Sequence, residues 1–274
     1  LLATLIAWSC GALLWLVGWR APKQFYQREA LAIVALTWVA TGLLGALPFW
    51  CTGVIDYIPS VFESVSGFTT TGASVLDNVE ALPKSILFWR SFTHWLGGIG
   101  IIVLFMAVLP YLGTGGKLLF KVESSGPNPR GIRPRVRDNA GILFRIYVGL
   151  TILWTIAYLL TGKMDPFDAV CHTFGALATG GYSTRQASIA AYDSVAVEVV
   201  TILDMVSGAT SFGLYFLFLQ RKWNVFLKDT EWRAMILILV CASVFIAFNV
   251  AGCFGAKPIA ADAAMPPSGE TPSL

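Results

Sequence analysis

Two runs rich in threonine and glycine carry residue types that could bind a cation stripped of its water. They are residues 66–74, SGFTTTGAS, and residues 174–183, FGALATGGYS. A cation that leaves water needs oxygen ligands in place of its hydration shell, and a narrow, extended strand can supply a ring of backbone carbonyls. Glycine permits backbone angles that a Cβ disfavours, and the threonine hydroxyls add further oxygens. The pattern predicts a selectivity filter that contains Thr70, Thr71, Gly72, Ala178, Thr179 and Gly180.

The two runs belong to an internal repeat. One register aligns Gly67 with Gly175, Gly72 with Gly180, Thr93 with Thr201 and Gly100 with Gly208. Taken alone, each run favours a plain glycine-containing turn between helices. Two copies in the same apolar context favour the filter instead, because irregular backbone within a membrane is tolerated only where it is buried in protein or lines a water-filled path.

The composition is that of an integral membrane protein. Of the 274 residues, 56% are apolar and 13% are charged, and the mean hydropathy is +0.68. This leaves too little polar surface for a soluble globule. The net charge of +3 comes from basic residues in short loops, which gives no indication of nucleic-acid binding. The five cysteines are scattered singly and predict neither a disulfide framework nor a metal site.

Six apolar segments are long enough to cross a hydrocarbon core of roughly 30 Å. They are residues 1–19, 31–50, 85–110, 142–161, 195–219 and 232–251. Two further apolar segments, residues 58–68 and 166–177, are too short to span, and each leads into a threonine–glycine run. We predict that they are re-entrant pore helices in an all-α fold, in which an outer helix, a pore helix, a filter and an inner helix occur twice. An acid and a proline suit the start of each pore helix. These residues are Asp56 with Pro59, and Asp165 with Pro166.

Basic residues are concentrated in alternate loops. One loop contains Arg20, Lys23 and Arg28, the next Lys117, Lys121, Arg130, Arg133, Arg135 and Arg137, and the third Arg221, Lys222 and Lys228. The loops between them contain only Lys84, Lys163 and Arg185. By the positive-inside rule the basic loops are cytoplasmic, so both pore helices are predicted to enter the membrane from its outer face.

Three charged residues within or beside the apolar segments leave alternatives open. Arg90 could place positive charge near a pore mouth or pair with Glu63, and it could equally extend to the membrane interface. Asp204 lies deep in an apolar segment, where an unpaired carboxylate is costly, and this favours a functional or paired role.

The two histidines invite a metal or proton-relay interpretation. His94 and His172 lack the spacing of metal ligands, so hydrogen-bonded packing is favoured for both. The glycines of residues 97–100 favour a close helix crossing over a hinge. No nucleophile-and-base pair or metal cluster is visible in the apolar segments, and an enzyme is therefore not predicted.

The residues around both runs carry a family resemblance. Residues 62–74, FESVSGFTTTGAS, and 88–104, FWRSFTHWLGGIGIIVL, closely resemble the first repeat of the TrkH family, within the Trk/Ktr/HKT superfamily of potassium transporters. Residues 168–184, DAVCHTFGALATGGYST, resemble its second pore loop, and residues 229–233, DTEWR, resemble the start of its third repeat. The resemblance extends over nearly all of residues 31–251.

The resemblance implies a K⁺-channel-like fold and K⁺ uptake across the bacterial inner membrane. In that family four repeats surround one pore, the subunit forms a homodimer in the lipid, and a cytosolic nucleotide-binding regulatory subunit, TrkA-like, gates it. Gly72 and Gly180 match the family's filter glycines, and a glycine in the first repeat implies K⁺ selectivity where serine marks Na⁺. K⁺ is then the transported ion, held by backbone carbonyls of Thr70, Thr71 and Thr179, with no organic cofactor.

The chain departs from the family pattern towards its end. After residue 251 neither a pore helix nor a threonine–glycine run occurs, and residues 252–274 are predicted to be disordered. Two repeats provide half of a fourfold filter. The alternatives are therefore a truncated fragment that does not conduct alone, and a Na⁺-permeable transporter of the same superfamily.

The predicted organisation follows from these segments. It comprises an N-terminal transmembrane helix with a cytoplasmic loop (residues 1–30), a first pore repeat (31–110), a cytoplasmic loop (111–141), a second pore repeat (142–219), a loop with the first helix of a third repeat (220–251), and the tail (252–274).

Overall fold

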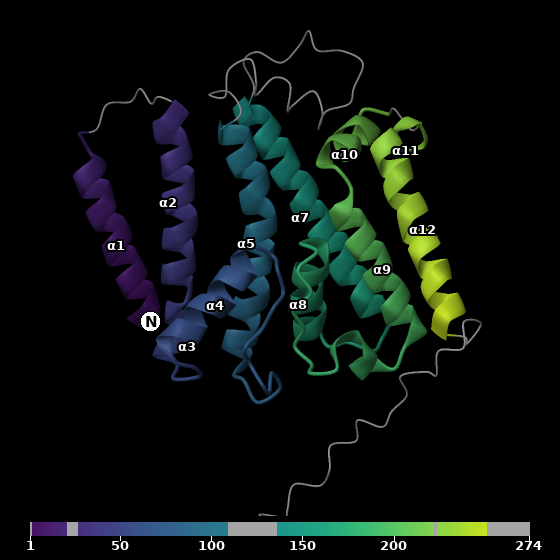
Figure 1. The fold of residues 1–274 in the computed structure, drawn as a ribbon, viewed down its shortest axis with the longest axis horizontal. Helices are drawn as coiled ribbons and strands as arrows, with labels where there is room; N and C mark the ends of the chain where they lie inside the picture. Colours follow the sequence, from purple (N-terminus) through teal and green to yellow (C-terminus); the bar gives the residue numbers. More distant parts are fainter. Residues whose placement is uncertain (1, 21–26, 109–135, 222–223, 251–274) are drawn as a thin grey trace, which may run out of the picture. The chain divides into compact units, whose positions relative to one another are not determined.

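The computed structural model describes residues 2–20, 27–108, 136–221 and 224–250, and every regular element within them is a helix (Figure 1). In chain order these are α1 (Leu2–Gly18), α2 (Gln27–Gly45), α3 (Leu47–Cys51), α4 (Tyr57–Phe68), α5 (Lys84–Val108), α7 (Val136–Leu160), α8 (Pro166–Leu177), the 3₁₀ helix η2 (Ser188–Tyr192), α9 (Val195–Ala209), α10 (Phe212–Leu219), α11 (Val225–Lys228) and α12 (Thr230–Val250). The predicted all-α fold is confirmed. The predicted tail and most of the predicted loop 111–141 lie outside the described residues.

The chain divides into two compact units, Leu1–Arg221 and Lys222–Leu274. In the second unit the described helices are α11 and α12. The apolar span Thr230–Asn249 of α12 has no residue buried inside the structure. Outward-facing apolar side chains along a whole helix are typical of contact with lipid.

The first unit contains both predicted repeats (Figure 1). In the first repeat the long helix α2 is followed by α4 and α5, and in the second α7 is followed by α8 and α9. The short helices α4 and α8 occupy the same half of this unit, whereas α10 and the C-terminal end of α1, which adjoin two of the basic loops, lie at the opposite end. This arrangement is the one that the loop charges predict.

The lengths of the helices suit a bilayer. Among the described residues three helices can cross a membrane by length and composition, and the bent pair α9 and α10 would make a fourth. The three spans are Ala32–Cys51, Gly141–Leu160 and Thr230–Asn249. Helix α5 has 25 residues, which corresponds to roughly 37 Å at about 1.5 Å per residue. The chain is a multi-pass membrane protein.

Two predicted spanning segments are broken in the structure. The helix within residues 31–50 is interrupted at Ala46, because Pro48 lies in the first turn of a new short helix, α3. The segment 195–219 is two helices, α9 and α10, that meet at 92°. Thr210, at the junction, has an extended backbone with ψ 135°.

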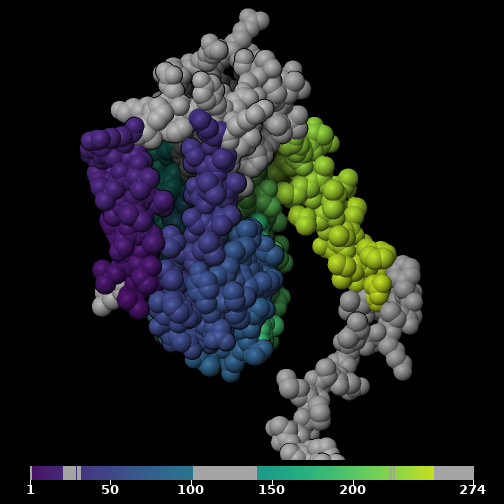
Figure 2. Space-filling model, turned by 60° about the vertical axis from the view of Figure 1, so that its left-hand side comes forward, coloured from purple at the N-terminus to yellow at the C-terminus, as the bar shows by residue number. Residues whose placement is uncertain are grey.

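The first unit has an apolar exterior and a partly polar interior. Large apolar side chains of α1, α2 and α7 are exposed, and none of the residues of α1 is buried. Figure 2 shows the face where α1 stands beside α2, above the first pore region. Buried polar side chains gather on the pore helices and on α5, among them Glu63, Arg90 and Asp168. An apolar exterior and a polar interior are expected for a protein in a bilayer. Lipid surrounds the exterior, and polar groups must find their hydrogen-bond partners within the protein.

Candidate ion filter

The two threonine–glycine runs fold in the same way where they leave their pore helices. Each run closes its helix with two backbone hydrogen bonds of the same kind. In the first run, the N–H of Thr70 donates to the carbonyl of Gly67 (3.0 Å) and that of Thr71 to Ser66 (2.9 Å); in the second, Thr179 donates to Ala176 (2.9 Å) and Gly180 to Gly175 (2.9 Å). The repeat in sequence is therefore a repeat in backbone structure.

The backbone angles repeat as well. Thr70 and Thr179 both have φ 54°, and two residues further along Gly72 and Gly181 have φ 78° and 93°, while the residue between does not have a positive φ. A positive φ is unusual for a β-branched residue and costs free energy. The same strained step in both runs indicates that the conformation serves a site.

The structure moves the predicted alignment by one residue. Gly72 corresponds to Gly181 and not to Gly180, because these two glycines have the same place in the backbone pattern. The shift is larger in the inner helices. A Cβ on Gly97 would collide with the carbonyl oxygen of the last residue of α4, and a Cβ on Gly208 would collide with that of the last residue of α8. Gly208 is thus the counterpart of Gly97 rather than of Gly100, since the connection after the second threonine–glycine run is longer.

The two runs also meet in space. A Cβ on Gly72 would collide with the carbonyl oxygen of Gly180 and lie 3.1 Å from its carbonyl carbon. Only glycine permits this approach of the two backbones. Of the predicted filter residues, Thr71 and Thr179 are exposed, Thr70, Gly72 and Gly180 are partly exposed, and Ala178 is buried, where it caps α8.

Helix α5 supports both runs from behind. Towards the first repeat, Thr93 Oγ1 lies against Gly67 so closely that a Cβ there would collide with it. Towards the second repeat, a Cβ on Gly180 would lie 2.5 Å from the His94 ring, and one on Gly98 would lie 3.2 Å from Ala178 Cβ. Residues four apart lie on one side of a helix. Thr93 and Gly97 therefore form one stripe of α5, which contacts the first repeat, and His94 and Gly98 form the adjacent stripe, which contacts the second. Gly97 and Gly98 therefore make the close crossing that was predicted, whereas a Cβ on Gly100 would meet only the Trp38 ring, at 3.9 Å.

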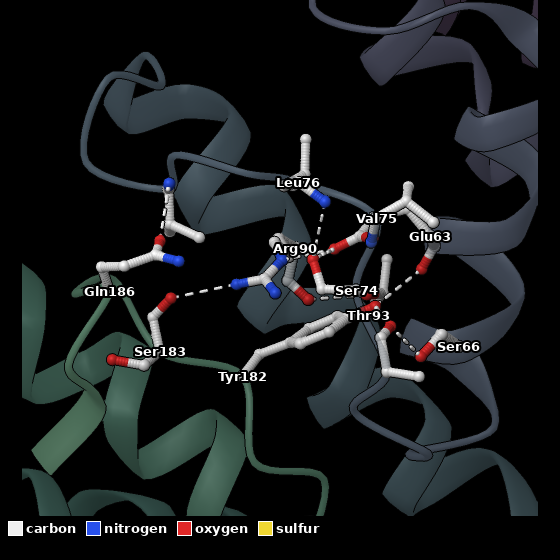
Figure 3. A network of polar contacts seen from close by, with 12 residues as sticks. Glu63, Ser66, Ser74, Val75, Leu76, Arg90, Thr93, Tyr182, Ser183 and Gln186 are labelled. Carbon is white, nitrogen blue, oxygen red and sulfur yellow. Dashed lines mark hydrogen bonds and ion pairs between the residues drawn. The ribbon is translucent and has the colours of Figure 1, made fainter. Parts of the chain in front are cut away.

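A buried ion pair lies behind the first run (Figure 3). Arg90 Nε donates to Glu63 Oε1 at 2.6 Å, and their side chains are 5% and 0% exposed. Glu63 also accepts from the Ser74 hydroxyl (3.0 Å) and the N–H of Val75 (3.1 Å), which fixes the end of the first run. Of the alternatives left open for Arg90, the structure contains the pair with Glu63.

The second repeat uses different residues at the corresponding place. His172 Nε2 lies 3.0 Å from the Ser183 hydroxyl, as Glu63 Oε1 does from that of Ser74, and its Nδ1 lies 2.8 Å from the carbonyl of Asp168. The Asp168 carboxylate accepts from three side chains. They are Thr184 (2.8 Å), Tyr192 (2.8 Å) and Arg185 (3.1 Å from Nη2). The prediction of hydrogen-bonded packing is right for His172.

Besides the Ser64 hydroxyl, two buried polar side chains have no hydrogen-bond partner among the described residues. One is His94, at both ring nitrogens, and the prediction of hydrogen-bonded packing is therefore wrong for it. Its ring instead packs on Tyr182, with centroids 4.0 Å apart. The other is Asp204, at both carboxylate oxygens. Asp204 is fully buried, and a pairing partner for it does not occur in the described part of the chain.

Tyr182 is a residue of this site that the sequence pattern did not predict. This side chain is 3% exposed, and its hydroxyl lies 3.0 Å from the carbonyl of Glu63 and 3.2 Å from that of Ala73, both in the first repeat. The available sequence signal was an aromatic residue directly after Gly180 and Gly181, where the first repeat has Ala73. In the described residues no group of three or more His, Cys, Asp or Glu side chains could hold a metal ion.

The chain matches one protein-family model, TrkH, described as a cation transport protein, over residues 2–254. Among curated relatives, a Trk system potassium uptake protein TrkH of Halomonas elongata is 41% identical over 233 residues, which are 84% of this chain and 48% of the relative. The protein of the same name in Escherichia coli strain K12 is 38% identical over 254 residues, 89% of this chain and 52% of the relative.

A solved structure has the same fold. The crystal structure of the potassium transporter TrkH from Vibrio parahaemolyticus superposes with a TM-score of 0.76 at 34% identity, and the match covers 93% of this chain and 52% of that one. The chain thus spans about half the length of the relatives that it matches.

Proposed function

Because the chain belongs to the TrkH family of cation transport proteins, we propose that it provides two walls of a pore for K⁺ uptake across the bacterial inner membrane. Its relatives are named as potassium uptake proteins of the Trk system. The observation that carries the proposal is the repeated strained backbone of the two threonine–glycine runs, which meet at Gly72 and Gly180.

The proposed filter replaces the water around K⁺ with backbone oxygens. When residues with positive and negative φ alternate, successive peptide units have the same orientation. Their carbonyl groups can then face one side of the strand. Carbonyls of Thr70, Thr71 and Thr179 are the proposed ligands, and Ala178, the C-cap of α8, directly precedes Thr179. A ring of such dipoles compensates the ion for its lost hydration shell.

The pore helices add a favourable field. α4 ends at Phe68 and α8 at Leu177, immediately before the two runs. The C-terminal end of a helix carries a partial negative charge, which stabilises a cation near it. Because the runs that follow the two helices meet at Gly72 and Gly180, both helix ends lie near one region.

A complementation assay tests the proposal. The complete reading frame that contains this chain is expressed in a bacterium that lacks its own K⁺ uptake, and growth at low K⁺ and uptake of an Rb⁺ tracer are measured. Restored growth, with Rb⁺ uptake that excess Na⁺ does not inhibit, is the expected result. Uptake that Na⁺ inhibits as strongly as K⁺ does would favour the Na⁺-permeable alternative, and no uptake from protein verified in the membrane would contradict the proposal.

The family resemblance also motivates two proposed partners. One is a second copy of the subunit, and the other is a cytosolic nucleotide-binding regulatory subunit. Co-purification of a tagged and an untagged copy in mild detergent tests the first, and a change of Rb⁺ uptake on deletion of the regulatory gene tests the second.

A further inference from the structure

Tyr182 joins the second filter to the first repeat. It follows Gly181, yet its hydroxyl reaches the carbonyls of Glu63 on α4 and Ala73 after the first filter, at 3.0 Å and 3.2 Å. Figure 3 shows its ring lying across the boundary between the two repeats, beside Arg90. A buried tyrosine whose hydroxyl is satisfied by another repeat fixes the relative position of the two chain segments.

Arg90 completes this connection from α5. Its guanidinium carbon lies 3.7 Å from the centre of the Tyr182 ring, and its Nη1 donates to the carbonyl of Ser183 at 3.0 Å. At the same time its Nε donates to Glu63 Oε1 at 2.6 Å. The planar guanidinium has donors in fixed directions, which a lysine ammonium lacks. Arg90 therefore binds the segment after the second filter with one nitrogen and the pore helix of the first repeat with another.

The connection is not part of the repeat. The contact between pore helix and post-filter serine recurs, as Glu63 with Ser74 and as His172 with Ser183. The position that corresponds to Tyr182 in the first repeat is Ala73, which has no side chain to make such a bridge. The contact between each pore helix and the serine after its own run therefore does not require Arg90 and Tyr182 to meet.

We propose that Arg90, Glu63 and Tyr182 form a clamp between the repeats that sets the height of the second filter strand relative to the first, and thereby determines the discrimination between K⁺ and Na⁺. These are positioning residues, since they act through the backbone that follows each filter. The proposal rests on the proposed function. A carbonyl ring discriminates by the number and placement of its oxygens, so a shift of one strand along the pore alters its preference.

The decisive variant is Tyr182→Phe. It keeps the ring against Arg90 and His94 and removes only the hydroxyl. The matched control is Tyr158→Phe, which removes the hydroxyl of another buried tyrosine, one that donates to Thr201 within the second repeat alone, at 3.0 Å. The complete gene product carrying each change is reconstituted in liposomes, and tracer fluxes of Rb⁺ and Na⁺ are measured beside membrane abundance.

We expect the Rb⁺-to-Na⁺ flux ratio to fall about three- to tenfold in Tyr182→Phe and to remain unchanged in Tyr158→Phe, at equal abundance. Arg90→Lys should resemble Tyr182→Phe, because it keeps the charge and loses the two-directional donation. An unchanged ratio in Tyr182→Phe, or the same fall in both tyrosine variants, overturns the clamp.

A measurement without transport separates this proposal from the proposed function. Melting temperatures of Arg90→Gln, Tyr182→Leu and the double variant form a cycle. The clamp requires that the two effects are not additive. Additive effects overturn the clamp whatever ion is carried, whereas a coupled pair in a protein without Rb⁺ flux supports the contact between the repeats and contradicts the proposed K⁺ function.

Discussion

Gly72→Ser is the substitution that most directly tests the filter geometry. Gly72 has φ 78°, and the left-handed region costs a residue with a Cβ roughly 1–2 kcal/mol. The added Cβ would also collide with the carbonyl oxygen of Gly180. Relief of that collision requires a shift of one strand, and displacements on the order of 1 Å change the performance of a positioned site by up to about 10²-fold. We expect the K⁺-to-Na⁺ selectivity to fall at least about tenfold, or about 1.4 kcal/mol.

Substitutions at two other glycines distinguish the effect of backbone strain from the effect of the collision with Gly180. Gly53 and Gly162 have φ 70° and 67°, and a Cβ at either would meet nothing within 4 Å. Gly53→Ser and Gly162→Ser therefore impose the same strain in loops outside the filter. Rb⁺ and Na⁺ fluxes and membrane abundance are measured for all three variants. Selectivity retained in Gly72→Ser, or lost equally in the two loop variants, would refute the reasoning.

The remaining predictions concern topology and buried charge. The topology is tested with single cysteines in a background without the five native cysteines. Cysteines at the exposed positions Asp77 and Glu80 should react with an impermeant thiol reagent only from outside, and cysteines at Arg20 and Arg221 only from the cytoplasm. Reaction of both pairs from one face would mean that α4 crosses the membrane completely. Asp204→Leu should stabilise the protein by about 1–3 kcal/mol, because it removes a buried group without a partner, whereas Glu63→Leu should destabilise it by about 3–5 kcal/mol, because Arg90 is left buried and unpaired. Thermal unfolding in detergent checks both, and a lower melting temperature for Asp204→Leu would indicate that Asp204 has a partner after all.

The pore helices were predictable because their signals are local. The segment 166–177 coincides with α8, and Asp165 caps it by accepting from the N–H of Asp168 at 2.9 Å. Asp56 occupies the same place before α4 without a side-chain cap, yet the helix starts only one residue from its predicted start. Apolar length and an acid–proline start suffice for such elements.

The breaks and the register were harder to predict. Pro48 is a recognisable signal for a helix break. For the bend after Ala209, the only sequence signal is a group of small and β-branched residues around Thr210. The repeat register failed by one residue at Gly180, because sequence identity favours pairing a Thr-Gly step with a Thr-Gly step, while the backbone pairs Thr70 with Thr179. The cross-repeat contacts of Tyr182 depend on packing that no local pattern contains.

The two-sided packing of α5 has an evolutionary consequence for the duplicated repeats. Thr93 leaves no room for a side chain at Gly67 of its own repeat, and His94 leaves none at Gly180 of the other. A larger residue at position 180 is therefore acceptable only together with a smaller one at position 94, although the two belong to different repeats. The two repeats are therefore coupled at these positions, and compensating pairs between positions 94 and 180 should appear when related sequences are compared.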